Sequence, residues 1–236
     1  MILQSFRLFL RQIVDDAMLV MVLVAPVLAA CAFRFGIPAL EMLLVEWIGK
    51  PVIAPWYPLV DLFLGILAPY MLLFASTMVL LEERDEGLAV YLAVTPLGRR
   101  GYLLSRLVLP GFLASLFTLV LVSFFSLVPL SLPERLALSL AATVLALVMS
   151  LLVYALAGNR IEGMALAKIS SIILLGVVLP FVTRSPWRYL GGFLPSFWLG
   201  EARVAGGLLP AAAFALVSLL WLGLLLRHFS RRMARG

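Results

Sequence analysis

Long apolar segments separated by short polar ones make up most of the chain. A membrane-spanning helix needs roughly 20 mainly apolar residues, and six segments qualify, at about 17–33, 59–81, 103–130, 136–157, 166–183 and 208–226. We therefore expect an all-α integral membrane protein with six transmembrane helices. No polar stretch between them is long enough for a soluble domain, so residues 1–236 are expected to form a single transmembrane domain.

The segment before the first span has a different pattern. Gln4, Arg7, Arg11 and Asp15 recur every three to four residues, and the positions between them are mostly apolar. On a helix this spacing places one polar stripe beside an apolar face. We expect an amphipathic helix that lies along the membrane interface. The alternative is that these residues simply extend the first spanning helix.

Two spans contain residues that disturb a plain apolar helix. Pro110-Gly111 lies near the start of the third span and should kink or divide it. Asp61 lies about three residues inside the outer end of the second span, and we interpret it as an interface residue. No span has an Asp, Glu, Arg or His near its centre, where transporters that couple to protons or ions usually need one.

Two segments on the side opposite the termini, 37–58 and 187–207, mix apolar residues with Trp and Tyr. Aromatic rings of this kind favour the headgroup region of a membrane. Short surface or re-entrant helices fit this composition, with Glu41, Glu46 and Glu201 facing water. Such segments either gate a substrate path or only anchor the protein in the interface, and the sequence leaves both interpretations open.

Composition and charge agree with a membrane protein and suggest its orientation. The 236 residues are 64% hydrophobic and 13% charged, against about 45–50% and about 25% in soluble domains. Cytoplasmic termini place twelve of the 18 basic residues inside and six outside, as the positive-inside rule favours. Membrane topology thus accounts for the net charge of +6, and we expect no nucleic-acid partner.

The chain lacks the residues that most enzymes and cofactor sites require. It has no G-x-x-x-x-G-K-[ST] phosphate loop, no G-x-S-x-G or H-E-x-x-H motif, one histidine (His228) and one cysteine (Cys31). ATP binding by a P-loop, a histidine-based triad and a zinc site are therefore not expected. We expect neither catalysis nor a cofactor in this chain.

Charge gathers in one place, the segment EERDEGLAVYLAVTPLGRRGYLLSRL at 82–107. Gly87 permits a sharp turn after the acidic cluster, residues 88–94 are long enough for about two helical turns, and Pro96 disfavours helix at the preceding residue. We expect a short cytoplasmic surface helix between the second and third spans, with Leu88, Tyr91 and Leu92 on one side. An exposed apolar face of this kind needs lipid or a protein partner.

This segment resembles the corresponding loop in the permease subunits of type 2 ABC exporters. In that family a segment rich in Glu and Arg leads into a glycine, a short helix, a Thr-Pro step and basic residues before the next span. The resemblance covers about 25 residues in motif and most of the chain in layout. It implies a coupling helix that docks on a separate ATPase, with these residues at the contact: Glu82, Glu83, Arg84, Asp85, Glu86, Gly87, Leu88, Tyr91, Leu92, Thr95, Pro96, Arg99 and Arg100.

The same resemblance implies the partners. Two copies of the ABC ATPase would bind ATP and magnesium, and a second permease subunit, identical or different, would complete the transporter among the membrane lipids. The expected location is the inner membrane of a bacterial or archaeal cell, with both termini cytoplasmic.

A second cytoplasmic loop, AGNRIEGMALAK at 157–168, joins the fourth and fifth spans. It resembles the matching loop of small drug-export permeases, including fluoroquinolone-export types. Gly158-Asn159 indicates a turn, and Arg160 and Glu162 either pair with each other or contact the ATPase. The alternative is a short solvated connection.

We thus expect the transmembrane subunit of an ATP-driven exporter, with a hydrophobic drug or a lipid as substrate by resemblance alone. One alternative is the substrate-capturing membrane subunit of an energy-coupling-factor importer, which would not need the charged loop. Another is a membrane-embedded enzyme that acts on lipid, for which we find no convergent polar site. A purely structural membrane scaffold also remains open.

Overall fold

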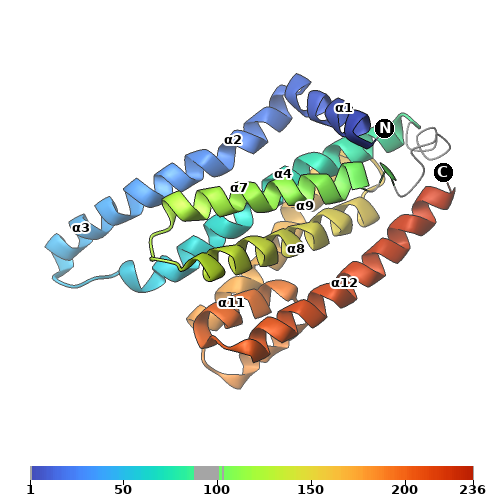
Figure 1. The fold of residues 1–236 in the computed structure, drawn as a ribbon. Coiled ribbons are helices and arrows are strands. Elements are labelled where there is room, and N and C mark those ends of the chain that lie inside the picture. Colours follow the sequence, from blue (N-terminus) through green and yellow to red (C-terminus); the bar gives the residue numbers. More distant parts are fainter. Residues whose placement is uncertain (1, 88–100, 103, 236) are drawn as a thin grey trace.

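The computed structural model of the chain describes residues 2–87, 101–102 and 104–235, and within these residues it contains helices and turns but no strand (Figure 1). The α-helices are α1 (Ile2–Asp15), α2 (Ala17–Cys31), α3 (Ile37–Ile48), α4 (Tyr57–Asp85), α7 (Leu109–Phe125), α8 (Leu132–Leu156), α9 (Arg160–Leu174), α10 (Leu179–Val182), α11 (Pro195–Ala205) and α12 (Leu208–Arg235). Two π-helical turns, η1 (Ala32–Gly36) and η3 (Leu104–Val108), and three 3₁₀ segments, η2 (Ala54–Trp56), η4 (Leu175–Val178) and η5 (Pro186–Phe193), connect them.

Six helical segments are long and apolar enough to cross a membrane, which confirms the expected all-α fold. They are Ala17–Ile48, Ala54–Asp85, Leu104–Phe125, Leu132–Leu156, Arg160–Val182 and Leu208–His228. The number and order match the sequence pattern, whereas the ends differ by up to 15 residues at the first span. Each large difference has a local cause in a capped turn or a proline.

α4 forms the centre of the bundle. It packs against α2, α7, α8 and α9, and its side chains Leu73, Ala75 and Met78 are fully buried. α2–α3 and α12 lie on the outside, on opposite sides of this centre (Figure 1). Both chain termini and the end of α4 lie at one end of the molecule, and the α3 and α11 segments lie at the other (Figure 1).

α1 is a helix separate from the first span. Asp16 between α1 and α2 has an extended backbone (φ −98°, ψ 105°), so the chain turns there and the alternative of a simple helix extension is wrong. On the apolar face of α1, Phe9 and Ile13 are buried, whereas Leu3 and Leu8 are exposed. The helix therefore packs on the bundle with part of its apolar surface and leaves the rest uncovered.

The first span is longer than expected because α2 continues through the π turn into α3. Pro38 in the first turn of α3 has no amide hydrogen, and a π turn accommodates such a missing hydrogen bond without ending the helix. Within 37–58, where short surface or re-entrant helices were expected, α3 is therefore not a separate helix but the continuation of the first span. A second π turn, η3, lies just before Pro110, where the sequence predicted a disturbance of the third span.

Glu41 does not face water, contrary to expectation. Its side chain is 8% exposed, and its carboxylate accepts hydrogen bonds from the backbone N–H groups of Val52, Ile53 and Ala54 at 3.0, 2.7 and 3.2 Å. The chain after α3 thus folds back over the glutamate. Glu46 is exposed, as expected.

Asp61 lies near the start of the second span and is buried in protein rather than placed in the interface. Its carboxylate accepts hydrogen bonds from the amides of Leu127 and Val128 at 2.7 and 2.9 Å. These bonds hold the turn between α7 and α8, so the third span ends at Phe125 and not near residue 130. The fourth begins early, at Leu132, because Ser131 and Glu134 form a capping box.

The segment 187–207 contains the short helices η5 and α11, as expected, but Glu201 is buried. Its side chain is 5% exposed and pairs with Arg188 at 2.7 Å. The neighbouring Tyr189 hydroxyl raises the pKa of Arg188 most, and Glu201 adds to this. Because Arg188 compensates its charge, Glu201 can be buried inside the segment. The prediction that Glu201 faces water is therefore wrong.

Candidate functional site

The residues expected to couple to an ATPase fall into two groups. Glu82, Glu83, Arg84 and Asp85 form the last turn of α4, and Glu86 and Gly87 follow it. Leu88, Tyr91, Leu92, Thr95, Pro96, Arg99 and Arg100 lie outside the described residues. Gly87 has a φ of +73°, and no atom lies within 4 Å of where a Cβ would be. The predicted sharp turn after the acidic cluster is thus confirmed at Gly87.

Glu83 is buried and pairs with Arg106 of η3. Nε of Arg106 lies 3.1 Å from both carboxylate oxygens, and the side chains are 2% and 3% exposed. The hydroxyl of Tyr102 donates to the same carboxylate at 2.9 Å. Burial, with a smaller contribution from Glu83, raises the pKa of Tyr102, so its hydroxyl stays a donor. These hydrogen bonds offset part of the cost of removing both charges from water.

The same guanidinium reaches α1. Nη1 of Arg106 donates to the backbone carbonyl of Ser5 at 2.8 Å, and its Cζ lies 5.2 Å from the centre of the Phe9 ring. The hydroxyl of Ser76 donates to the Arg106 carbonyl. Arg106 therefore joins three elements: α1, α4 and η3. Glu83 precedes and Arg106 follows residues 88–100 in sequence, so this pair joins the described residues on the two sides of that segment.

Arg84 and Asp85 contact the turn between α8 and α9. Nη2 of Arg84 donates to the carbonyl of Ala157 at 2.8 Å, and its guanidinium lies 5.0 Å from the centre of the Tyr154 ring. The carboxylate of Asp85 accepts the backbone N–H of Arg160 at 3.0 Å. The last turn of α4 thus also holds the start of the fifth span.

Arg160 pairs with acids on two other elements. Its guanidinium contacts Glu82 at 2.9 Å and also pairs with Asp16. Asp16 in turn caps α2 by accepting the amides of Met18 and Leu19 at 2.9 and 3.3 Å. The hydrogen bond from Arg160 is the largest cause that lowers the pKa of Asp16 below its ordinary value of 3.8.

Glu162 does not pair with Arg160, so that alternative from the sequence is wrong. Its carboxylate accepts the N–H of Gly158 at 2.6 Å, while its own N–H donates to the side chain of Asn159 at 2.9 Å. This reciprocal cap starts α9 at Arg160, which shortens the expected loop 157–168 to three residues. Arg160 and Glu162 therefore lie in the first turn of a helix.

Together these contacts form what we call the α4-end network, defined by Asp16, Glu82, Glu83, Arg84, Asp85, Arg106 and Arg160. Among the described residues, Glu86 is the charged member of the 82–86 cluster whose side chain makes no hydrogen bond or ion pair. The sequence placed these charges together but did not indicate their partners. One signal was available in the sequence. Arg106 places a positive charge inside the start of an apolar span, which predicts a buried acidic partner such as Glu83.

A cavity of about 620 Å³ lies between α2, α4 and α9, beside this network. Met18, Met71 and Met164 line it together with the aromatic rings of Tyr70 and Phe74, and Lys168 lies at its wall. The hydroxyl of Tyr70 donates to the carbonyl of Ala167 at 2.9 Å, which fixes the ring. Methionine side chains adapt to ligands of different shape, so this wall suits an apolar or aromatic molecule.

Within the described part of the chain, no three His, Cys, Asp or Glu residues gather in a way that could hold a metal ion. The side chains of the α4-end network offer ion pairing and hydrogen bonding, and those of the cavity between α2, α4 and α9 offer mainly apolar contact.

Comparison with known proteins agrees with this architecture. Residues 9–229 match the family model described as "Fluoroquinolones export permease protein Rv2686c-like". The chain belongs to this family. Two curated relatives, the fluoroquinolones export permease proteins MT2760 and Rv2686c of Mycobacterium tuberculosis strains CDC 1551 / Oshkosh and H37Rv, are each 25% identical over 190 residues, which cover 79% of this chain and 75% of theirs. No solved structure matches.

Family membership and the six long apolar helices make this chain a multi-pass membrane permease. The matched range runs from the middle of α1 into the last turns of α12, so it includes every residue of the α4-end network. The resemblance of the second charged segment, 157–168, to fluoroquinolone-export permeases agrees with this family, whereas the resemblance of 82–107 to type 2 ABC exporters stays a prediction.

Proposed function

We propose that this permease is the membrane-spanning subunit of an ATP-driven exporter and that residues 82–107 couple it to the ATPase subunits. Two copies of a separate ABC ATPase bind ATP and magnesium, and a second permease subunit completes the complex. The end that holds both termini faces the cytoplasm, as the distribution of basic residues favours.

The α4-end network is the observation that carries this proposal. Residues on both sides of the 88–100 segment are tied to each other by Glu83 and Arg106, and to α1, α2 and α9 by Arg106 and Arg160. A force on that segment would therefore reach four of the elements around the bundle at once. Buried polar networks of this kind have discrete arrangements, which suits a switch between two states.

The missing phosphate loop supports a separate energy source. The sequence has no P-loop motif, and no span carries an acid or base near its centre that would suit coupling to ions. Nucleotide binding by a partner would instead shift the equilibrium between two arrangements of the permease.

We place the substrate path at the cavity between α2, α4 and α9. Both relatives are named as fluoroquinolone export permeases. The cavity volume of about 620 Å³ lies within the range of about 300–1,000 Å³ that holds drug-sized molecules, and its methionine and aromatic walls suit an aromatic drug. Lys168 would attract an anionic group on such a drug, and the movement would be outward, from the cytoplasm.

Reconstitution with a candidate ABC ATPase subunit tests the proposal. The double variant Glu86→Lys with Leu92→Asp should abolish association or stimulation of ATP hydrolysis while the membrane domain still folds. Glu46→Lys, a charge reversal at an exposed position at the other end of the molecule, is the matched control and should leave both unchanged. If the double variant associates with the ATPase and stimulates it like the native chain, the coupling role of this segment is wrong.

The substrate path is tested separately by transport in membrane vesicles. Met71→Trp fills the cavity and should reduce transport of a fluoroquinolone without reducing ATPase association. Val120→Trp, at an exposed apolar position of α7, is the matched control. Equal transport by the two variants would exclude this cavity as the path.

A further inference from the structure

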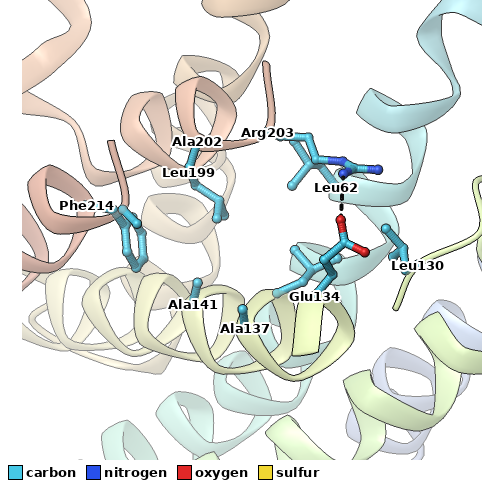
Figure 2. A pocket seen from close by; sticks show the side chains of 11 residues that line it. Leu62, Leu130, Glu134, Ala137, Ala141, Leu199, Ala202, Arg203 and Phe214 are labelled. Atoms are coloured by element: carbon cyan, nitrogen blue, oxygen red, sulfur yellow. Dashed lines mark ion pairs between the residues drawn. The ribbon is translucent and has the colours of Figure 1, made fainter. Parts of the chain in front are cut away.

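A second pocket lies far from the α4-end network, at the end of the bundle that holds α11. It has a volume of about 290 Å³ and lies between α4, α8, α11 and α12. Leu62, Leu138, Leu199 and Phe214 give it apolar walls, and Ala137 and Ala141 leave space along α8 (Figure 2). The proposed function makes no use of this pocket.

Two opposite charges lie at one edge of the pocket. Figure 2 shows Arg203 of α11 and Glu134 of α8 facing each other there. Nη1 of Arg203 lies 3.8 Å from Oε1 of Glu134, which is an ion pair but too long for a hydrogen bond. Among the described residues, no group accepts a hydrogen bond from the Arg203 side chain, although that side chain is only 26% exposed.

Glu134 also has an uncommitted oxygen. Its Oε2 accepts the N–H and the hydroxyl of Ser131 at 2.8 and 2.6 Å, as part of the capping box that starts α8. Its Oε1 faces Arg203 without a hydrogen bond. The edge of the pocket thus offers guanidinium donors beside a carboxylate acceptor, a few ångströms apart.

The depth of the Arg203–Glu134 pair in the membrane indicates which part of a lipid lies beside it. α8 has 25 residues, which makes it about 37 Å long, and the hydrocarbon core of a bilayer is about 30 Å thick. The first turn of α8 therefore extends into the headgroup layer, and Glu134 is in that turn. The cavity beneath the pair is apolar and lies at acyl-chain depth.

We propose that this pocket binds one phospholipid whose headgroup carries a phosphate and a primary ammonium group. The phosphate accepts hydrogen bonds from the Arg203 guanidinium, whose planar donors match phosphate oxygens. The ammonium donates to Oε1 of Glu134. The end of one acyl chain lies against Leu199 and Phe214.

Charge and size favour this occupant over others. An anionic headgroup without an ammonium is repelled by Glu134, and a quaternary ammonium has no N–H to donate to it. The pocket volume of about 290 Å³ is at the lower limit of the range of about 300–1,000 Å³ for drug-sized molecules. It fits a part of a lipid whose remainder stays in the bilayer.

Native mass spectrometry of the full chain with added lipid tests the proposal. Phosphatidylethanolamine should be retained about tenfold more tightly than phosphatidylcholine or phosphatidylglycerol with the same acyl chains. Arg203→Gln should weaken phosphatidylethanolamine binding by about tenfold or more, as expected when a hydrogen-bonded ion pair is lost. Glu134→Gln keeps the capping contacts and should remove the preference over phosphatidylglycerol.

Matched variants separate the pocket from the rest of the surface. Ala137→Phe should block the lipid, whereas Ala212→Phe on an exposed face of α12 and Arg184→Gln at an exposed position on the same side should not. Arg203→Lys keeps the charge, loses the paired donors and should bind with intermediate strength, which covers the case in which Arg203→Gln does not fold.

Three outcomes would overturn the proposal. The first is equal retention of the three lipids by the native chain. The second is equal loss of phosphatidylethanolamine in Arg203→Gln and Arg184→Gln. The third is displacement of phosphatidylethanolamine by a fluoroquinolone, which would assign the pocket to a transported drug. Because none of these readouts involves the ATPase, failure here leaves the proposed coupling function intact.

Discussion

Glu83 and Arg106, 23 residues apart in the chain, form an ion pair that is nearly closed to solvent, with side chains 2% and 3% exposed. Residues 88–100, which are proposed to couple to an ATPase, lie between Glu83 and Arg106 in sequence. Breaking a buried pair by removing one partner costs about 3–5 kcal/mol, because the other charge stays buried without compensation. This pair therefore stabilises the same end of the molecule that is proposed to move.

Glu83→Gln should lower the free energy of unfolding by about 3–5 kcal/mol. Arg106→Gln should have a similar effect. The double variant should lose clearly less than the sum of the two, since no lone charge remains. Thermal unfolding in detergent, followed by the loss of monodisperse protein, measures each change.

Glu86→Gln is the control for this pair, because Glu86 is exposed. It should change the free energy of unfolding by no more than about 0.5 kcal/mol. Additive effects of Glu83→Gln and Arg106→Gln would contradict a direct interaction between the two side chains.

Asp16 should make stability depend on acidity. Its pKa is lowered in the folded protein, chiefly by the hydrogen bond from Arg160. A lowered pKa contributes stability that is fully present above the ordinary value of 3.8 and is lost as the pH falls through the folded value. The native chain should therefore melt higher than Asp16→Asn at pH 7, and the difference should shrink below about pH 4.

Asp15→Asn provides the comparison, because Asp15 is exposed and, in the described part of the chain, its ion-pair partner is Arg11 of the same helix. Its melting temperature should follow that of the native chain from neutral to acidic pH. A difference between Asp16→Asn and the native chain that stays constant down to pH 3 would exclude the Asp16–Arg160 contact as its cause.

Gly87→Ala should disturb the turn that leads into the proposed coupling segment. The φ of +73° is a left-handed conformation, which costs roughly 1–2 kcal/mol for a residue with a Cβ. No neighbour would clash with that Cβ, so the effect comes from the backbone alone. ATPase stimulation by the permease should fall in Gly87→Ala and less in Gly87→Asn, since Asn adopts this conformation more readily.

Gly36→Ala is the matched control for the turn. Gly36 has an ordinary helical φ of the kind any residue adopts, and its added Cβ also meets no atom within 4 Å. ATPase stimulation should stay at the native level. A loss in Gly36→Ala as large as that in Gly87→Ala would show that the effect is not specific to the turn.

Gly200→Ala should destabilise the packing of α11 on η4. A Cβ at Gly200 would lie 2.4 Å from the backbone carbonyl oxygen of Val177, so α11 would have to move away from η4. Overpacking of this kind costs about 1–3 kcal/mol. Gly223→Ala, whose Cβ would meet no atom within 4 Å in α12, should be neutral or slightly stabilising. Equal melting temperatures for the two variants would contradict the close approach of α11 to η4.

The sequence predicted the spans because apolar length is a property of each segment by itself. It failed where the folding of the chain back on itself decides the outcome. Glu41 looked water-facing because the hydrophobic pattern of 37–58 does not show that residues 52–54 return to its carboxylate. Glu201 failed for the same reason, since its partner Arg188 belongs to a different short helix.

The charged residues of the candidate site show the same limit. The position of Glu82 to Gly87 after the second span follows from the hydrophobic pattern, and the turn at Gly87 follows from its residue type. The contact partners of these charged residues do not follow from the sequence. Arg160, for example, contacts Asp16 and Glu82, which are 144 and 78 positions away in the chain. The association of residues 88–100 with an ATPase remains a prediction of the sequence resemblance.

Two contacts, one at each end of the permease, should respond differently to salt. At the end with α3 and α11, the buried carboxylate of Asp61 binds two backbone amides, and dissolved ions screen such short internal contacts very little. At the end with both termini, Arg160 and Glu82 have side chains that are 24% and 40% exposed. Raising the ionic strength thus weakens the Arg160–Glu82 pair far more than the Asp61 contacts, and this pair lies at the end through which the proposed ATPase would act.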